Sequence, residues 1–195
     1  MSWLLWSLAL WSPAMGDPAI GRLNHAGYRH KQHCTAVLVA PNAALTATHC
    51  LQGLDPREAH LLLGYDRGTW QEHLRPSAAH DLGRDLTMIC LSQDARATPL
   101  ILSPEPPASG ETLIASGYGS PSVHRLRQEA CKVTGVRAEE TFRLDCRLAP
   151  GNSGGPLLRH SDKGDAVVGI ASASNQTESL AVVIAAARNR SLCPK

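Results

Sequence analysis

The hydrophobic positions of the chain form short apolar stretches that are separated by turn-forming residues. Gly and Pro recur between these stretches, and no long segment with helical periodicity lies between them. Many segments of strand length without intervening helices are typical of an all-β sandwich or barrel. The predicted strands are Thr35–Ala40, Ala43–Ala47, His60–Leu63, Leu86–Leu91, Glu111–Ala115, Lys132–Val136, Pro156–Leu158, Ala166–Ala171 and Leu180–Ala185.

A proline-rich stretch at 95–110 separates two halves of similar size. Proline removes a backbone donor and interrupts regular pairing, so this stretch predicts a linker. We therefore expect one domain at 17–100, a linker at 101–110 and a second domain at 111–195. Residues 185–190 could close the chain with a short helix.

Residues 1–16 predict a secretory signal peptide. The run Trp3–Trp11 is almost entirely apolar, and Ala14–Gly16 places small residues where a leader peptidase cleaves. The run is too short to span a bilayer comfortably, and its richness in Trp suits a targeting segment better than a buried strand, the alternative. We expect a mature chain from Asp17 that is secreted or periplasmic and has no membrane association after signal removal.

Composition narrows the class of protein further. The chain has 195 residues, of which 43% are hydrophobic and 18% are charged, and this balance excludes a disordered chain. The net charge is +2 and no run of Lys or Arg stands out. Because a nucleic-acid-binding surface needs clustered positive charge, no nucleic-acid partner is expected.

The cysteines indicate an oxidising compartment. An even number of cysteines behind a signal peptide predicts disulfide bonds. Six cysteines allow roughly 15 pairings, and the sequence alone does not choose between them. No C-x-x-C motif is present, which argues against a redox pair or a ribbon-type zinc site. The six are Cys34, Cys50, Cys90, Cys131, Cys146 and Cys193.

The strongest chemical signal is the segment Gly151–Pro156, which has the sequence Gly-Asn-Ser-Gly-Gly-Pro. Its glycines allow a tight turn that holds the Ser153 hydroxyl away from the backbone. They also allow backbone N–H groups to converge on a developing oxyanion. An ordinary glycine-rich turn is the alternative.

His49 is the second candidate, because it ends a predicted strand and directly precedes Cys50. Cys34 begins the preceding strand, and a Cys34–Cys50 bridge would pin the loop that carries His49. This suits a general base, whose geometry must be fixed before its pKa matters. A lone histidine at a strand end is otherwise an ordinary surface or core residue.

Asp85 is the third candidate, because it opens the apolar stretch Leu86–Leu91. A buried carboxylate that accepts a hydrogen bond from an imidazole fixes its tautomer and stabilises the imidazolium. A plain aspartate at the start of a strand is the alternative. Asp81 is a competing candidate, although no apolar stretch follows it directly.

Together the three candidates follow one another in the order His, Asp, Ser, and the chain resembles the chymotrypsin/trypsin-like serine proteases. The resemblance extends from about Ile20 to about Ala187, and its best-matched segments are Cys34–Leu51 and Cys146–Leu158. Within the family, the chain is similar to the short secreted bacterial branch that includes the glutamyl endopeptidases. The resemblance implies two antiparallel six-stranded β-barrels with the active site in the cleft between them.

The resemblance also implies a role for each matched residue. Ser153 would be the nucleophile, His49 the general base and Asp85 the residue that orients His49. The backbone N–H groups of Gly151 and Ser153 would form the oxyanion hole. Ser172 would form a hydrogen bond near Asp85. The strand that would pair with the substrate backbone carries Ser172, Ala173 and Ser174, unless it is a plain barrel strand.

Two positions depart from the family pattern. Asn152 stands where zymogen-type relatives carry an Asp that pairs with a newly formed N-terminal ammonium. Asn cannot form that ion pair, so we expect activity without this activation step; a processed N-terminus at Ile20 is a weaker alternative. Thr48 replaces a small Ala beside the base and adds a hydroxyl that needs a partner if it is buried.

The specificity pocket is the least constrained part of the resemblance. Arg147 falls near the position where trypsin-like relatives carry an Asp, and it would favour acidic substrate side chains if it faces the pocket. Ala171 occupies the position of the histidine that glutamyl enzymes use. An Arg147 side chain that points to solvent is an equal alternative.

The resemblance has further implications for bridges and partners. A Cys131–Cys146 bridge would brace the loop that leads to Ser153, which leaves Cys90 to pair with Cys193. No metal and no organic cofactor are implied. The expected partner is a protein or peptide substrate, and we expect a monomer.

The leading hypothesis is a secreted serine endopeptidase that acts through an acyl-enzyme. A catalytically inactive binding protein of the same fold is the main alternative, although all three triad residues are present. A non-peptidase hydrolase with the same triad also stays open. Another alternative is a zinc site formed by His33, Cys34, His49 and Cys50, because their side chains are of suitable ligand types. Against it, these residues form two pairs of sequence neighbours, and neighbouring residues rarely converge on one ion without strain.

Overall fold

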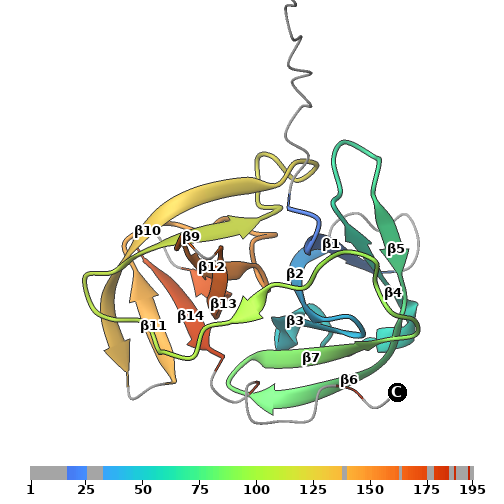
Figure 1. Ribbon diagram of the computed structural model, residues 1–195, viewed down its shortest axis with the longest axis horizontal. Coiled ribbons are helices and arrows are strands. Elements are labelled where there is room, and N and C mark those ends of the chain that lie inside the picture. The colour runs from blue at the N-terminus through green and yellow to red at the C-terminus, as the bar shows by residue number, and fades with distance from the viewer. Residues whose placement is uncertain are drawn as a thin grey trace, which may run out of the picture.

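The computed structural model describes residues 17–25, 33–137, 140–162, 164–174 and 178–184 together with Ala187 and Cys193 (Figure 1). The signal peptide expected at 1–16 and most of the helix expected at 185–190 lie outside these ranges. Within them, no helix is both long and apolar enough to cross a membrane.

The chain folds into two lobes of β-strands that lie side by side (Figure 1). The first lobe contains β1 (Ile20–His25), β2 (His33–Ala40), β3 (Ala43–Ala47), β4 (Ala59–Leu63), β5 (Glu72–Leu74), β6 (Pro76–Gly83) and β7 (Leu86–Leu91). The second contains β8 (Ile101–Leu102), β9 (Thr112–Gly117), β10 (Arg127–Arg137), β11 (Thr141–Leu144), β12 (Pro156–Arg159), β13 (Ala166–Ser174) and β14 (Ser179–Val183). Two short 3-10 turns, η1 (Thr48–Cys50) and η2 (Pro56–Glu58), lie in the first lobe.

The first lobe is one curled antiparallel sheet with the order β5-β4-β1-β2-β3-β7-β6. Strands β3 and β7 are buried at every position, as their continuous apolar sequences predict. Leu45 pairs with Met88, and Ala47 pairs with Leu86. The end of β3, which leads to His49, therefore lies beside the start of β7, which follows Asp85.

The second lobe is a closed ring of six strands in the order β12-β9-β10-β11-β14-β13, and pairing between β12 and β13 closes it. Strand β8 adds to β13 in parallel, outside the ring. Because the ring is closed, each of its six strands has a hydrogen-bonded neighbour on both sides. The interior is filled by apolar side chains that include Leu113, Val133, Phe142, Leu144, Leu157, Val168 and Val183.

The prediction of an all-β fold with two barrel-like lobes is confirmed: the second lobe contains a closed six-stranded barrel, and the first is a curled sheet. The first lobe has seven strands, and no pairing between β5 and β6 closes it within the described residues. Strand β5 has only three residues, and Pro76 then begins β6. Because proline cannot donate to a ladder, the sheet stays open at this corner. In the second lobe, β8 is a seventh, parallel strand.

The hydrophobic pattern misses β1, β5, β6, β8 and β11. Strand β6 exposes much of its length, so it has no apolar signature. Strand β11 has the clean alternation of a half-buried strand, but it spans only four residues. Strand β1 carries the buried Arg22 in its middle, which hides an otherwise core-forming segment.

The chain passes from the first lobe to the second between Leu100 and Ser103. The Leu100 N–H donates to the Leu38 carbonyl of β2 at 3.0 Å, whereas the Ser103 N–H donates to the Val167 carbonyl of β13 at 2.8 Å. The proline-rich segment at 101–110 therefore packs along the second lobe and does not bridge a gap.

Arg159 of β12 holds this segment in place. Its guanidinium donates to the Pro106 carbonyl at 3.0 Å and to the Ser103 Oγ at 2.6 Å. It also pairs with Glu111, with an Nε to Oε1 distance of 2.5 Å. This pairing raises the pKa of Arg159 and lowers the pKa of Glu111.

A hydrophobic cluster shared by both lobes packs them together. It joins side chains of β1, β2, β3 and β7 to side chains of β12, β13 and β14. Its buried members include Ile20, Val37, Leu45, Met88, Leu158, Val167, Ile170 and Val182.

Candidate active site

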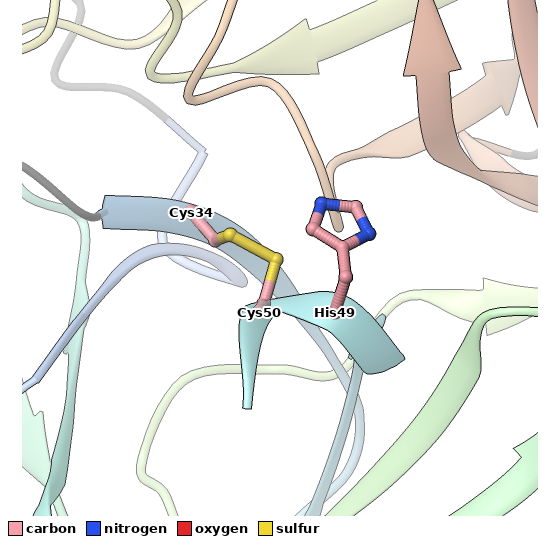
Figure 2. Close-up of side chains that lie close together, drawn as sticks. All are labelled: Cys34, His49 and Cys50. Atoms are coloured by element: carbon pink, nitrogen blue, oxygen red, sulfur yellow. A yellow bond between two sulfur atoms is a disulfide. The ribbon is translucent and has the colours of Figure 1, made fainter. Parts of the chain in front are cut away.

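His49 lies in η1, directly after the buried strand β3. The next residue, Cys50, is bonded to Cys34 of β2, and their Cα atoms are 6.1 Å apart. This disulfide fixes the turn against the sheet, while the His49 side chain stays 43% exposed. Figure 2 shows the imidazole ring rising from the turn beside the disulfide.

Asp85 lies in the turn between β6 and β7, where both Arg84 and Asp85 have a positive φ of 56° and 64°. The turn directs its carboxylate at η1. The Asp85 Oδ1 accepts from the His49 backbone N–H at 2.9 Å, and Oδ2 lies 2.9 Å from the His49 Nδ1. The Ser172 Oγ of β13 donates to Oδ2 at 2.5 Å. Asp85 therefore joins the two lobes at one point.

The competing candidate Asp81 does not reach His49. Its Oδ1 accepts from the Gly83 N–H at 2.8 Å and from the Thr48 hydroxyl at 3.4 Å. Thr48 has a closer partner in the Thr87 hydroxyl at 2.9 Å. The extra hydroxyl of Thr48 is thus satisfied within the first lobe.

Electrostatics favour a charged carboxylate beside a readily protonated imidazole. The hydrogen bond to Asp85 is the main reason that the pKa of His49 is raised, and it outweighs the opposing effect of burial. Burial alone would raise the pKa of Asp85, but hydrogen bonds from His49 and Ser172 outweigh it and hold this pKa below its usual value. Because an ionised carboxylate can only accept, Nδ1 of His49 carries the proton and Nε2 is left as the basic nitrogen.

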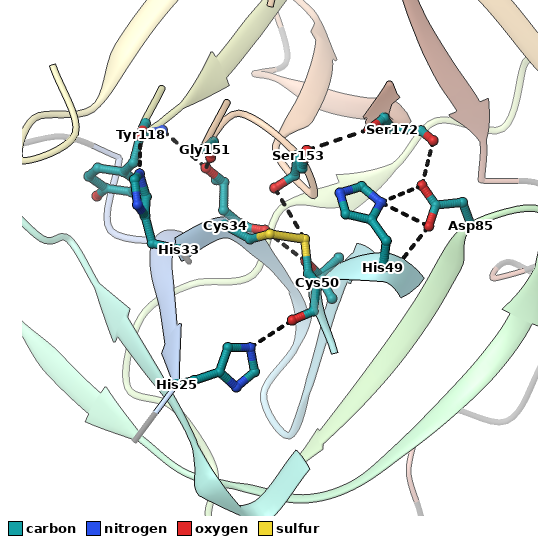
Figure 3. The surroundings of a disulfide bond; sticks show 12 residues. His25, His33, Cys34, His49, Cys50, Asp85, Tyr118, Gly151, Ser153 and Ser172 are labelled. Carbon is teal, nitrogen blue, oxygen red and sulfur yellow. Dashed lines mark hydrogen bonds and ion pairs between the residues drawn. A yellow bond between two sulfur atoms is a disulfide. The ribbon is translucent and has the colours of Figure 1, made fainter. Parts of the chain in front are cut away.

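Ser153 follows β11 in a glycine-rich loop before β12. Its Oγ lies 3.5 Å from the Ser172 carbonyl oxygen. Among the hydrogen bonds of the described residues, none joins the Ser153 hydroxyl to the His49 ring. Figure 3 nevertheless shows the imidazole ring lying between Asp85 and Ser153, with its second nitrogen on the Ser153 side. Such hydrogen bonds are often long or absent before a substrate is bound.

Thr35 of β2 anchors the Ser153 loop through hydrogen bonds. The Thr35 N–H donates to the Ser153 carbonyl at 2.8 Å, and its hydroxyl donates to the Gly151 carbonyl at 2.8 Å. The same hydroxyl accepts from the Tyr118 N–H at 3.0 Å. His33 of β2 adds a contact from Nε2 to the Tyr118 carbonyl at 2.9 Å. The sequence does not single out Thr35, whose only signal is its place next to Cys34.

Two backbone donors in this loop are uncommitted. Gly151 has a φ of 100°, a left-handed conformation that glycine adopts readily. Within the described part of the chain, neither the Gly151 N–H nor the Ser153 N–H donates to a protein acceptor, whereas Asn152, Gly154 and Gly155 all donate within the fold. Two free donors beside a serine hydroxyl are what an oxyanion requires.

A cavity of about 170 Å³ lies beside Ser153. Its lining carries no charged side chain and consists of Leu148, Ala149, Pro150, Ser153, Ala171, Ser172, Ala173 and Ser174. The three expected strand residues, Ser172 to Ser174, are therefore brought to Ser153.

Arg147 does not line this cavity, so of the two alternatives for its side chain, facing the pocket or pointing to solvent, the geometry agrees with the second. Its side chain is exposed and lines a separate hollow of about 390 Å³ with Asn152, Arg127 and Glu129. The reason is the alternation along the segment: Cys146 and Leu148 are buried, so the residue between them points outward.

Asn152 packs against two glycines, Gly117 at the end of β9 and Gly119 in the connection to β10. A Cβ on Gly117 would lie 2.5 Å from the Asn152 Oδ1, and a Cβ on Gly119 would overlap the same amide. Both glycine positions therefore have no room for a side chain while the Asn152 amide keeps its place. Asn152 carries an amide, so no ion pair stabilises the loop from this side.

The alternative of a zinc site would need thiolate ligands from Cys34 and Cys50, which are bonded to each other instead. Cys34, His49 and Cys50 lie close enough to share an ion, but the two sulfur atoms are bonded to each other at 2.02 Å (Figure 2). A disulfide sulfur is not a thiolate, and zinc binds the thiolate. His33 points instead to the Tyr118 carbonyl. The other two disulfides join Cys90 to Cys193 and Cys131 to Cys146.

Comparison with protein families matches residues 34–170 to the trypsin-like peptidase domain. That match covers more than half of the chain and contains both best-matched sequence segments. The chain belongs to the trypsin-like peptidase family. A curated relative, mouse kallikrein 1-related peptidase b3, is 31% identical over 120 residues, which are 49% of this chain and 46% of that protein. This trypsin-like peptidase domain thus matches about half the length of that relative.

Solved structures support the fold of this trypsin-like peptidase. A thermostable serine protease from an extremophilic microorganism has a TM-score of 0.71 and 18% identity, covering 88% of this chain and 94% of that one. An inactivated protease paralogue from the scabies mite has a TM-score of 0.72 and 14% identity, covering 86% and 87%. At these identities the similarity concerns the fold alone. The placement within the bacterial branch stays a prediction.

Proposed function

We propose that this trypsin-like peptidase is a serine endopeptidase that cleaves peptide bonds through an acyl-enzyme. The observation that carries the proposal is the His49 ring between the Asp85 carboxylate and the Ser153 side chain (Figure 3). A neutral imidazole whose Nδ1–H is held by a carboxylate is oriented to accept a proton at Nε2. The family assignment supports the same activity class.

In the proposed reaction, Ser153 Oγ attacks the peptide carbonyl carbon while His49 Nε2 takes the hydroxyl proton. The tetrahedral oxyanion accepts hydrogen bonds from the Gly151 and Ser153 N–H groups, each worth about 10²–10³ in rate. The C–N bond then breaks, and the leaving amine takes the proton from His49. Water attacks the resulting ester with His49 again as the base, which releases the acid and restores Ser153.

The cavity beside Ser153 supports a small, uncharged side chain immediately before the cleaved bond. It has a volume of about 170 Å³ and no charged lining residue. An acidic or basic side chain would lose its hydration there without a charged partner.

Because Asn152 cannot pair with an ammonium, we also propose that activity does not depend on an N-terminal ion pair at this position.

We propose that the protein acts as a monomer in a secreted or periplasmic setting, with a protein or peptide as its substrate. Three disulfides among the described residues support an oxidising compartment. Secretion is tested by sequencing the N-terminus of exported protein, which should begin at Asp17.

The activity is tested with a fluorophosphonate probe on chain 17–195 folded under oxidising conditions. Covalent labelling of the wild type and its loss in Ser153→Ala, together with cleavage of a peptide mixture, is the expected result. Removal of the nucleophile should reduce turnover by about 10⁶. A folded, disulfide-bonded protein that is not labelled would refute the proposal and favour an inactive binding protein of the same fold.

A further inference from the structure

A large hollow lies on the outer face of the second lobe, next to the cavity beside Ser153. Its volume is about 860 Å³, and it is formed by the ends of β10, β11, β13 and β14. We call it the arginine hollow. Its lining residues are Thr134, Gly135, Val136, Arg137, Thr141, Arg143, Ala173, Ser174, Glu178, Ser179 and Leu180.

Strand pairing sets a row of residues across the floor of the arginine hollow. Gly135 pairs with Arg143, Arg143 pairs with Leu180, and Leu180 pairs with Ala173. Directly paired residues share one face of a sheet, so Arg143 and Ala173 lie on the same face. Two strand spacings separate them, or about 10 Å between backbones. A long arginine side chain covers much of that distance.

The hollow is open at the positions that flank Arg143. A Cβ added to Gly135 would meet no atom within 4 Å. At the other end of the row, Ala173 has a minimal side chain and is exposed. The small residues at both ends leave room for a side chain of another molecule.

The charges in the arginine hollow are unbalanced. Arg137 and Arg143 are exposed, and neither forms an ion pair with a described carboxylate. Glu140, which lies three residues from each of the two arginines in the sequence, pairs with Arg84 of the first lobe. Glu178 also lines the hollow and has interactions of its own. Two guanidinium groups are therefore available to an anionic ligand, and their planar forks match a carboxylate well.

The arginine hollow is continuous with the cleft strand, because both it and the cavity beside Ser153 are lined by Ala173 and Ser174. The Ser172 hydroxyl points to Asp85 and the Ser174 hydroxyl points to the Leu148 carbonyl. Ser172 stands at a bulge of β13, so the direction of Ala173 follows from strand pairing. Ser174 pairs with the buried Ser179 and Ala173 pairs with Leu180, which places Ala173 on the face opposite Ser174, toward the hollow.

This arrangement determines which substrate residues can reach the hollow. Ser153 Oγ lies 3.5 Å from the Ser172 carbonyl, so the residue attacked by Ser153 lies level with Ser172. A substrate strand antiparallel to β13 then places its second residue before the cleaved bond opposite Ala173. Its side chain shares the face of Ala173, and the fourth residue before the bond returns to that face.

We propose that the arginine hollow is a substrate-binding site that selects an Asp or Glu side chain at the second or fourth residue before the cleaved bond. This inference rests on the proposed function, because it places the substrate by reference to Ser153. Arg143 and Arg137 bind the carboxylate, while the uncharged cavity beside Ser153 takes the residue at the bond itself.

The test separates binding from catalysis by using the Ser153→Ala protein, which keeps the hollow. Fluorescent peptides carry Glu or Gln at the second or fourth position before a fixed small residue, and anisotropy gives their Kd values at low salt. We expect the Glu peptide to bind about fivefold more tightly than the Gln peptide at one of these positions, as for a solvent-exposed ion pair. The preference should shrink as salt is added.

Arg143→Gln and Arg137→Gln are the test variants, and Arg127→Gln is the matched control. Arg127 is also an exposed arginine of β10, but it stands at the opposite end of the strand from Arg137. Along an extended strand the two residues are about 30 Å apart. We expect Arg143→Gln to abolish the Glu preference, Arg137→Gln to reduce it and Arg127→Gln to retain it.

Equal binding of Glu and Gln peptides at both positions would overturn the inference, as would an unchanged preference in the Arg137→Gln/Arg143→Gln double variant. These outcomes are distinct from failure of the proposed function. An unlabelled wild type would refute the peptidase, whereas a labelled wild type without a Glu preference would refute the hollow alone. Circular dichroism of each variant verifies that the fold is retained.

Discussion

At the scale of single residues, the Asp85 carboxylate is held by donors from two distant parts of the chain. His49 donates from its backbone and its ring, and Ser172 donates from the other lobe. These contacts keep the carboxylate ionised, and the carboxylate in turn favours the protonated form of His49. The pKa values of the pair are therefore set by contacts that the local sequence does not contain.

Asp85→Asn should lower kcat by about 10⁴, the usual effect of this change in a triad. A general base works only when neutral, so wild-type activity is lost as the pH falls through the raised pKa of His49. Without the carboxylate this pKa falls, and the acid limb of the residual activity should move to lower pH. Steady-state kcat measures the first effect, and the pH profile of kcat/KM measures the second.

Asp81→Asn is the control for this substitution. Asp81 lies on β6, the strand that precedes the Asp85 turn, but its carboxylate does not form a hydrogen bond to His49. Its profile should match that of the wild type. An acid limb in Asp85→Asn that stays in place would mean that Asp85 does not set the pKa of His49.

Gly154→Ala should destabilise the protein strongly. Gly154 has a φ of 81°, and a Cβ there would overlap the Thr35 carbonyl oxygen and the Thr46 hydroxyl. Left-handed strain of about 1–2 kcal/mol and overpacking of about 1–3 kcal/mol should add in the free energy of unfolding. Gly53→Ala isolates the first term, because Gly53 has a φ of 73° and open space around its Cα. Urea unfolding of both variants measures the difference; equal losses would show that the loop relaxes around the methyl group.

At the scale of elements, η1 is a turn of three residues that could not hold its position alone. It has no side-chain cap, and it is fixed by β3 on one side and by the Cys34–Cys50 bridge on the other. Helical turns this short have no intrinsic stability in water. The catalytic geometry proposed for His49 therefore depends on β2, the strand that carries Cys34.

Removal of this bridge in Cys34→Ala/Cys50→Ala should cost about 3 kcal/mol in the free energy of unfolding, as for loops of similar size. The bridge closes a sequence separation of 16 residues, and Cys131–Cys146 closes 15, so Cys131→Ala/Cys146→Ala is a matched reference for stability. Fluorophosphonate labelling below the midpoint of unfolding should be slower without Cys34–Cys50. An unchanged rate would show that β3 alone positions His49.

At the scale of the whole molecule, Thr35 of the first lobe holds the Ser153 loop of the second. Its backbone and hydroxyl bind the carbonyls of Ser153 and Gly151, and its side chain is fully buried. The relative position of the two lobes thus decides where Ser153 lies with respect to His49.

Thr35→Val keeps the volume of the side chain but removes its hydroxyl. The Gly151 carbonyl and the Tyr118 N–H then lose a partner, which should cost about 1–3 kcal/mol. Labelling by the probe should slow, because the loop that carries the proposed oxyanion donors loosens. In the control Thr46→Val, only a hydrogen bond within the first lobe is lost, so stability should fall while the labelling rate is retained. Equal labelling rates in the two variants would contradict a role for Thr35 in positioning.

By itself, the sequence determined the class of fold and the identity of the candidate residues. Continuous apolar stretches predict β3 and β7 with their observed bounds, because fully buried strands need no polar face. The segment around Ser153 and the pair His49-Cys50 stand out because tight turns and bridges require special residue types. These are local requirements, and a local pattern can carry them.

Only the tertiary structure decided the contacts between segments far apart in the chain. Asp85 rather than Asp81 reaches His49 because of a turn with positive φ, and Arg147 points away from the cavity because its neighbours are buried. Thr35 reaches the Ser153 loop through hydrogen bonds between the lobes, and the row from Gly135 to Ala173 is set by pairing between strands; no sequence spacing encodes either. Which strands become neighbours depends on burial of the whole hydrophobic surface, so these features follow from the fold and not from any single segment.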